Sequence, residues 1–172
     1  GDVVELGSTN TKVGKGEHIE DFATVVGRYV SALVARVFAQ ADVEAMAQFA
    51  GVPVVNALSD TSHPCQALAD ALTLQERFGS LDGLVFAYVG DGNNVAASTG
   101  LLLCALGAEV RIASPEGFEL PAGDIARADG LQGSLTQMRD PDAAVEGAQT
   151  VYTDTWISMG QEEEAAARRK VF

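Results

Sequence analysis

The segment DTSHPCQALAD, residues 60–70, holds several side chains that could take part in chemistry. His63 is one of only two histidines in the 172-residue chain, and Cys65 is one of only two cysteines. Gln66 follows, just where an apolar run becomes helical. The group could be a nucleophile, a metal site or a substrate clamp, or it could simply begin a helix.

The spacing disfavours a metal site and a cysteine nucleophile. A metal needs three or four ligands, and no C-x-x-C or H-x-x-x-H pattern supports His63 and Cys65, so we expect no metal. A nucleophilic Cys65 would need a base and an oxyanion hole, and beside Pro64, at a helix start, we expect it to pack instead. His63 stays open to a structural or a functional role. Gln66 lies near it in the first turn, and both side chains can donate hydrogen bonds without a fixed charge.

The segment VGDGNNVAAS, residues 89–98, resembles part of a dinucleotide-binding loop. Gly90 and Gly92 fit the first two glycines of G-x-G-x-x-G, but Val95 takes the third position. The next strand ends in Ser114 rather than an acid, so a nicotinamide cofactor is not favoured. We expect a tight turn with Asn94 capping the following helix, whose amides could still receive a polar ligand.

Two charged residues stand in or beside apolar runs. Arg36 lies in ALVARVF, where a buried arginine is costly unless it is paired. We expect either a structural salt bridge or an anion clamp, because guanidinium matches phosphate geometry. Asp154 ends the apolar run TVYT, where the structural alternative to a ligand contact is a cap for the next turn.

Strand-like and helix-like segments alternate along the whole chain, which predicts an α/β protein. Expected strands are 2–6, 32–38, 52–58, 84–89, 108–115, 134–138 and 150–154. Expected helices are 17–33, 41–51, 64–78, 95–107, 124–128, 141–148 and a final one within 158–172. The strands are continuous apolar runs, as in parallel sheets that are covered on both faces. Ligands of such sheets lie at the carboxyl ends of strands, where SDTSHPCQ, GDGNN and DTWISMG occur.

Composition restricts the class of protein and its partners. Hydrophobic residues make up 47% and charged residues 20%, which is typical of a globular chain. The net charge of −13 argues against nucleic acid or an anionic membrane as a general partner. No apolar run approaches the roughly 20 residues that span a bilayer. Two distant cysteines favour a reducing, cytoplasmic setting. Both ends look cut, so we expect a piece of a longer protein.

Six motifs together resemble the ornithine carbamoyltransferase family. They are GKGEHIEDFA, VARVF, VPVVNALSD, HPCQALAD, VGDGNNVAAS and YTDTWISMGQEEE, in the family's order and spacing across essentially all of the chain. The resemblance implies transfer of a carbamoyl group from carbamoyl phosphate to the side-chain amine of L-ornithine, giving L-citrulline and phosphate. That reaction belongs to arginine metabolism, and the resemblance implies no cofactor.

The resemblance also implies an architecture. We expect two Rossmann-like parallel α/β domains joined by a helix, both incomplete in this chain. Residues 1–65 would be part of the carbamoyl-phosphate-binding domain, 66–80 the linking helix and 81–172 part of the ornithine-binding domain. The parent protein would be a cytoplasmic homotrimer or a multiple of trimers.

The site residues follow from positions that match the family's motifs. The resemblance assigns carbamoyl phosphate and the catalytic roles to Arg36, His63 and Gln66. It assigns ornithine to Asn94, Asp154, Ser158 and Met159. We expect His63 and Gln66 to donate hydrogen bonds to the carbamoyl oxygen, where negative charge grows as the amine attacks.

Departures from the family leave other readings open. The family's Ser-Thr-Arg-Thr-Arg phosphate loop and its late His-Cys-Leu-Pro segment are absent from these residues. Lys12 stands where a glutamine or histidine is expected, and it could meet the phosphate of a neighbouring subunit. The alternatives are a carbamoyltransferase for another amine, such as putrescine or an acylated ornithine, and a catalytically dead paralogue that binds carbamoyl phosphate or a partner subunit.

Overall fold

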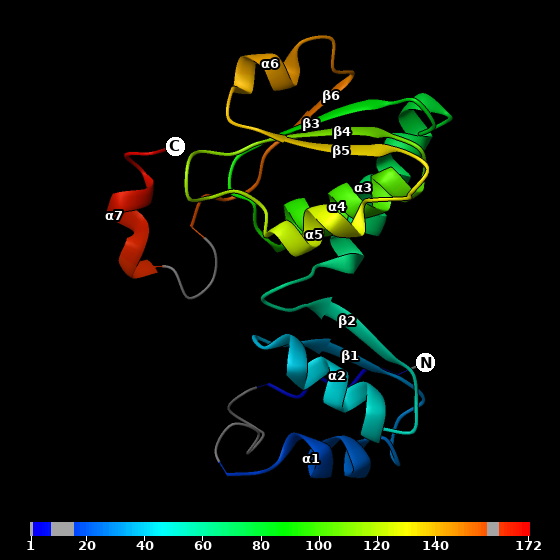
Figure 1. Cartoon of the computed structure of the whole chain (residues 1–172). Helices are drawn as coiled ribbons and strands as arrows, with labels where there is room; N and C mark the ends of the chain where they lie inside the picture. Colours follow the sequence, from blue (N-terminus) through cyan, green and yellow to red (C-terminus); the bar gives the residue numbers. More distant parts are fainter. Residues whose placement is uncertain (1, 8–15, 158–161) are drawn as a thin grey trace. The chain divides into compact units, whose positions relative to one another are not determined.

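The computed structural model describes residues 2–7, 16–157 and 162–172 (Figure 1). Lys12, Ser158 and Met159, which the sequence singles out, lie outside these ranges. The chain forms two compact units, residues 1–60 and 61–172. None of the helices in the described ranges is both long and apolar enough to cross a membrane.

The first unit contains a small parallel sheet with helices packed on it. Its elements are α1 (Ile19–Val26), β1 (Leu33–Arg36), α2 (Gln40–Phe49) and β2 (Val54–Leu58). Strands β1 and β2 pair in parallel, with a register shift between Ala35 and Arg36. Ala23 of α1 and Met46 of α2 meet in the core of this unit. Helix α2 starts at an alanine N-cap, which offers no side-chain acceptor, and the Asp60 carboxylate fills that role by accepting from the Gln40 amide at 2.9 Å.

Two predictions for the first unit are wrong. Residues 2–6 form no strand, and Val3 is 93% exposed, because no strand among the described residues pairs with this segment. The helix that we expected to reach residue 33 ends at Val26. It stops at Gly27, which disfavours helix and packs so closely on Ala50 that a Cβ would overlap the Ala50 carbonyl.

The second unit is a four-stranded parallel sheet in the order β5-β4-β3-β6. Its elements are α3 (Pro64–Phe78), β3 (Val85–Val89), α4 (Asn94–Ala105), β4 (Glu109–Ala113), α5 (Ala122–Arg127), β5 (Ser134–Met138), α6 (Pro141–Val145), β6 (Thr150–Tyr152), the 3-10 turn η1 (Glu162–Glu164) and α7 (Ala165–Arg168). Helices α3, α4 and α5 lie on one face of the sheet and α6 on the other (Figure 1). The prediction of parallel strands covered on both faces is confirmed for this unit.

The core of the second unit explains why its central strand β3 is a continuous apolar run. Phe86 and Val110, in neighbouring strands, are buried with Leu103 of α4 on one face. Ala87 and Ala113 are buried with Ala144 of α6 on the other. Both faces of β3 are therefore apolar, so VFAYV shows no period-2 alternation, whereas β4 (EVRIA) alternates because Glu109 and Arg111 pair with each other beside its buried Val110 and Ile112.

Most element bounds in the second unit agree with the sequence-based expectation. Helix α3 and strand β5 have the predicted bounds, whereas α6 ends at Val145, short of the predicted residue 148. The expectation that Cys65 packs is wrong, because Cys65 is exposed and only Cys104 is buried. Cys65 occupies the outward side of the first turn of α3, whereas Ala67 faces the core.

Candidate functional site

The turn between β3 and α4 lies at the carboxyl edge of the second sheet and is tightly packed. The Gly92 amide donates to the Phe118 carbonyl at 2.7 Å, and a Cβ on Gly92 would overlap the backbone of Glu119 and Leu120. A side chain is therefore excluded there by close backbone approach, independently of any cofactor. The second glycine of G-D-G is therefore a packing requirement in this chain.

Asn93, and not Asn94, is the N-cap of α4, which corrects the sequence-based expectation. The Asn93 Oδ1 atom accepts from the amides of Val95 and Ala96, at 3.0 Å each. Asn94 is the first helical residue and is half-buried. Two adjacent asparagines made the choice ambiguous, since either can cap a helix.

The nitrogen of the Asn93 side-chain amide binds Asp154. The Asn93 Nδ2 atom donates to Asp154 Oδ2 at 2.9 Å. Strands β3 and β6 are parallel neighbours, so the turn after β3 and the segment after β6 meet at one edge. The half-buried carboxylate of Asp154 is thereby fixed beside the start of α4.

Two stacked tyrosines lie behind this carboxylate. The rings of Tyr88 and Tyr152 have centroids 5.9 Å apart and an interplanar angle of 22°. Burial raises the pKa of Tyr88 well above its ordinary value, and the carboxylates of Asp154 and Asp91 raise it further. Tyr88 therefore stays neutral beside Asp154 and does not act as a proton acceptor.

A buried ion pair joins α7 to the turn after β3. The Arg168 Nη1 atom lies 2.7 Å from Asp91 Oδ2, with both side chains 9% exposed. The guanidinium also donates to the Trp156 carbonyl at 3.3 Å and lies 4.9 Å from the centroid of the Phe118 ring. Burial raises the pKa of Asp91, and the Arg168 guanidinium opposes that effect. The pair fixes the segments on both sides of residues 158–161.

At the start of α3, His63 is the N-cap residue and Pro64 is the first helical residue. The His63 backbone amide donates to Ser98 Oγ of α4 at 2.8 Å, and its Nδ1 atom is buried. Gln66 is half-buried, and its Nε2 atom donates to Asp70 Oδ1 at 2.8 Å. Residues near the start of α4 thus contact the segment that carries His63.

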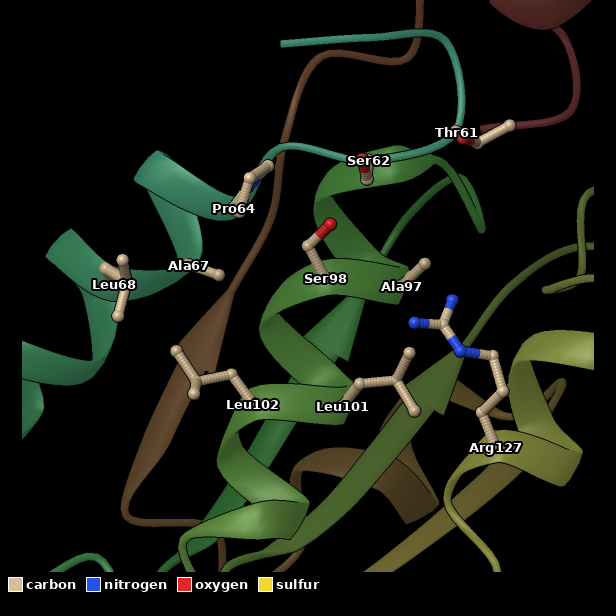
Figure 2. A pocket seen from close by; sticks show the side chains of 10 residues that line it. All are labelled: Thr61, Ser62, Pro64, Ala67, Leu68, Ala97, Ser98, Leu101, Leu102 and Arg127. Carbon is tan, nitrogen blue, oxygen red and sulfur yellow. The ribbon is translucent and has the colours of Figure 1, made fainter. Parts of the chain in front are cut away.

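A hollow of about 390 Å³ lies beside this region (Figure 2). Leu68 of α3, Leu101 and Leu102 of α4, and Arg127 of α5 contribute to its lining. Arg127 also pairs with Asp124 at 3.1 Å. No predicted site residue that the structure describes lines this hollow, so we do not place the chemistry there.

Arg36 departs from its expected environment. It is exposed at the end of β1, and no ion pair joins it to any other residue that the structure describes. The expected structural salt bridge is therefore not found in the described ranges. The two-stranded sheet of the first unit leaves every second side chain of β1 outside the core, which explains the exposure.

The second unit gathers four of the predicted site residues around the start of α4. His63 is tied to α4 through Ser98, Asn94 begins α4, and Asp154 is held by Asn93. Gln66 is tied to the same helix through Asp70, which accepts from Thr99 at 3.3 Å. Among the described residues, no group of three or more histidine, cysteine, aspartate or glutamate side chains could hold a metal ion.

Sequence reasoning missed Asn93, Asp70 and the Asp91–Arg168 pair. Asn93 was missed because its neighbour Asn94 is an equally good candidate for the N-cap. Gln66 and Asp70 are four residues apart, a spacing that places them on one face of a helix and could have signalled the contact. The Asp91–Arg168 pair has no local signal, since 77 residues separate its members.

Two family models cover nearly the whole chain. Residues 1–76 match the carbamoyl-phosphate-binding domain of aspartate/ornithine carbamoyltransferase. Residues 82–172 match the aspartate/ornithine-binding domain of the same family. The expectation of two α/β domains in one chain agrees with these matches.

Several known proteins similar to the chain are named ornithine carbamoyltransferase. The ornithine carbamoyltransferase of Gloeobacter violaceus is 50% identical over 177 aligned residues, which cover 100% of this chain and 56% of that protein. The solved ornithine carbamoyltransferase of Pyrococcus furiosus is 48% identical, with a TM-score of 0.92 over 97% of this chain and 55% of that one. That of Thermus thermophilus is 42% identical, with a TM-score of 0.83. The chain spans about half the length of the relatives it matches.

Proposed function

The chain belongs to the aspartate/ornithine carbamoyltransferase family, and we propose that the whole protein containing it converts carbamoyl phosphate and L-ornithine into L-citrulline and phosphate. The observation that carries the choice of an amino-acid acceptor is the Asn93–Asp154 hydrogen bond of 2.9 Å. It fixes a carboxylate at the carboxyl edge of a parallel sheet, where ligands bind and where an α-ammonium group could pair with it.

We assign the ornithine contacts to Asn94, Asp154, Ser158 and Met159. Asp154 pairs with the α-ammonium group, and the Asn94 side chain supplies a neutral hydrogen-bonding partner at the first residue of α4. The side-chain amine of the substrate must then extend away from Asp154. Relatives named ornithine carbamoyltransferase support this assignment.

We assign carbamoyl phosphate to Arg36, His63 and Gln66, with Lys12 as a further phosphate contact from a neighbouring subunit. The exposed guanidinium of Arg36 suits a phosphate, because its planar fork matches two phosphate oxygens. His63 donates to the carbamoyl oxygen. The nitrogen of Gln66 faces Asp70, so we reassign Gln66 to present its oxygen, which accepts from the carbamoyl amino group.

In the proposed reaction, the neutral side-chain amine of ornithine attacks the carbamoyl carbon. The new C–N bond forms as the bond from carbon to the phosphate oxygen breaks, and the electron pair leaves with phosphate. The proton that the amine loses goes to the departing phosphate. Negative charge grows on the carbamoyl oxygen, and one fixed donor to such an oxygen is worth about 3–4 kcal/mol in hydrolases. Orientation of the two substrates supplies the rest.

We assign each substrate to one of the proposed domains. We propose that residues 1–65 belong to the carbamoyl-phosphate-binding domain, 66–80 to the linking helix and 81–172 to the ornithine-binding domain. The whole protein is proposed to act in arginine metabolism, in the cytoplasm, as a homotrimer or a multiple of trimers. The net charge of −13 supports small-molecule substrates over nucleic acid or an anionic membrane surface.

The test is a citrulline assay of the full-length protein with carbamoyl phosphate and L-ornithine. We expect turnover of ornithine at least about tenfold faster, as kcat/KM, than of putrescine or an acylated ornithine, because the Asp154 contact needs a free α-ammonium group. Faster turnover of putrescine would reassign the acceptor. No turnover of any amine would support a binding paralogue. Purified residues 1–172 alone should show little or no activity.

A further inference from the structure

Asp70 of α3 accepts hydrogen bonds from three different elements of the second unit. Its Oδ1 atom accepts from Gln66 Nε2 at 2.8 Å, one turn earlier in the same helix. Its Oδ2 atom accepts from Thr99 Oγ1 of α4 at 3.3 Å, and Thr99 is fully buried. Tyr152 of β6 is also hydrogen-bonded to Asp70. Thr99 and Tyr152 therefore fix the Asp70 carboxylate, and this carboxylate in turn binds Gln66.

The same contacts determine which end of the Gln66 amide faces outward. A carboxylate only accepts, so the amide nitrogen of Gln66 must face Asp70. Burial and then the Asp70 carboxylate raise the pKa of Tyr152 to about 12, whereas a hydrogen bond from Gln66 lowers it. The Gln66 amide thus lies beside both Asp70 and Tyr152, with its nitrogen toward Asp70.

We propose that Asp70 is a positioning residue for carbamoyl transfer, which orients the amide of Gln66 so that its oxygen is offered to carbamoyl phosphate. This inference rests on the proposed function. Among the described residues, no hydrogen bond to Gln66 Oε1 is found, so that atom is available to a substrate N–H donor. Without Asp70, the amide could turn over and present a donor to the same substrate group.

The experiment compares Asp70→Ala, Asp70→Asn and wild type in the full-length enzyme by steady-state kinetics. Asp70→Ala should raise the KM for carbamoyl phosphate about tenfold and lower kcat, and leave the KM for ornithine within about twofold. Asp70→Asn should recover most of the loss, because its carbonyl oxygen still accepts from Gln66. A merely structural role would lower the active fraction and the melting temperature and would leave both KM values unchanged.

Asp82→Asn is the matched control. Asp82 accepts from the Gln132 amide at 3.2 Å, the same Asp–Gln chemistry, but it precedes β3 at the amino edge of the sheet. This variant should match wild type in all kinetic constants. If Asp70→Ala does not fold, Thr99→Val decides: it removes one donor to Asp70 at nearly constant volume and should raise the KM for carbamoyl phosphate about threefold.

The two hypotheses fail in different ways. If the wild-type enzyme makes no citrulline, the proposed function is wrong. An active wild type, with an unchanged carbamoyl-phosphate KM in Asp70→Ala, overturns the positioning role of Asp70. An unchanged KM in Thr99→Val overturns it as well, when that variant is the deciding one.

Discussion

Asn93 and Asp154 are joined by a 2.9 Å hydrogen bond although 61 residues separate them in the chain. The same asparagine caps α4 with its oxygen. One amide therefore fixes both the helix start and the carboxylate that we assign to the ornithine α-ammonium group. A substitution of Asn93 affects two functions, the helix cap and the contact with Asp154. An informative variant must keep one and remove the other.

Asn93→Ser separates these two functions, because serine caps a helix about as well as asparagine but cannot reach Asp154 with an amide nitrogen. We expect the KM for ornithine to rise about tenfold, and that for carbamoyl phosphate to stay within about twofold. Steady-state kinetics of the full-length enzyme measures both constants. Asp140→Ser is the control, since Asp140 caps α6 through the same pair of backbone bonds. Equal ornithine KM values in Asn93→Ser and wild type would contradict the assignment.

Arg168→Met should destabilise the protein by about 3–5 kcal/mol, because it leaves the buried Asp91 carboxylate without its charge partner. Urea unfolding followed by circular dichroism measures the loss. Replacing both partners, as Arg168→Met with Asp91→Leu, should cost less than Arg168→Met alone. The control is Arg139→Met, whose ion pair with Glu119 is largely exposed on the arginine side, so its loss should change the stability far less. Equal costs for the two arginine variants would refute this prediction.

Stability should fall as the pH rises from 10 to 12. The pKa of Tyr152 is raised from 10 to about 12 in the folded state, chiefly by burial. Between these values the unfolded state releases the phenol proton while the folded state keeps it, so rising pH favours unfolding. Tyr152→Phe should flatten the fall, as measured by the urea midpoint at several pH values. Identical slopes for wild type and Tyr152→Phe would rule out this contribution, since Tyr88 titrates in both proteins.

Local sequence patterns were sufficient wherever one segment determines its own structure. Proline at the first helical position and Gly79 after the last bounded α3 correctly. The continuous apolar run of β3 identified a parallel strand that is covered on both faces, whereas β4 and β5 also contain polar residues. The candidate site was found largely because polar clusters follow these strands, at the edge where ligands bind.

Features that depend on distant parts of the chain were not predictable from one segment. Residues 2–6 have strand-forming residues, but a strand exists only when another pairs with it. The exposure of Arg36 depends on how many strands and helices cover β1, which its apolar neighbours do not reveal. The Asp91–Arg168 pair and the Asn93–Asp154 bond both join residues more than 60 positions apart.

Within residues 1–172, the unequal exposure of the two cysteines predicts that a thiol reagent modifies one of them selectively. Cys104 is fully buried, and burial raises its pKa to about 11, so alkylating reagents should not modify it at neutral pH. Cys65 is exposed and lies two residues from His63. A fluorophore attached to Cys65 should therefore change its emission when carbamoyl phosphate binds at the start of α3.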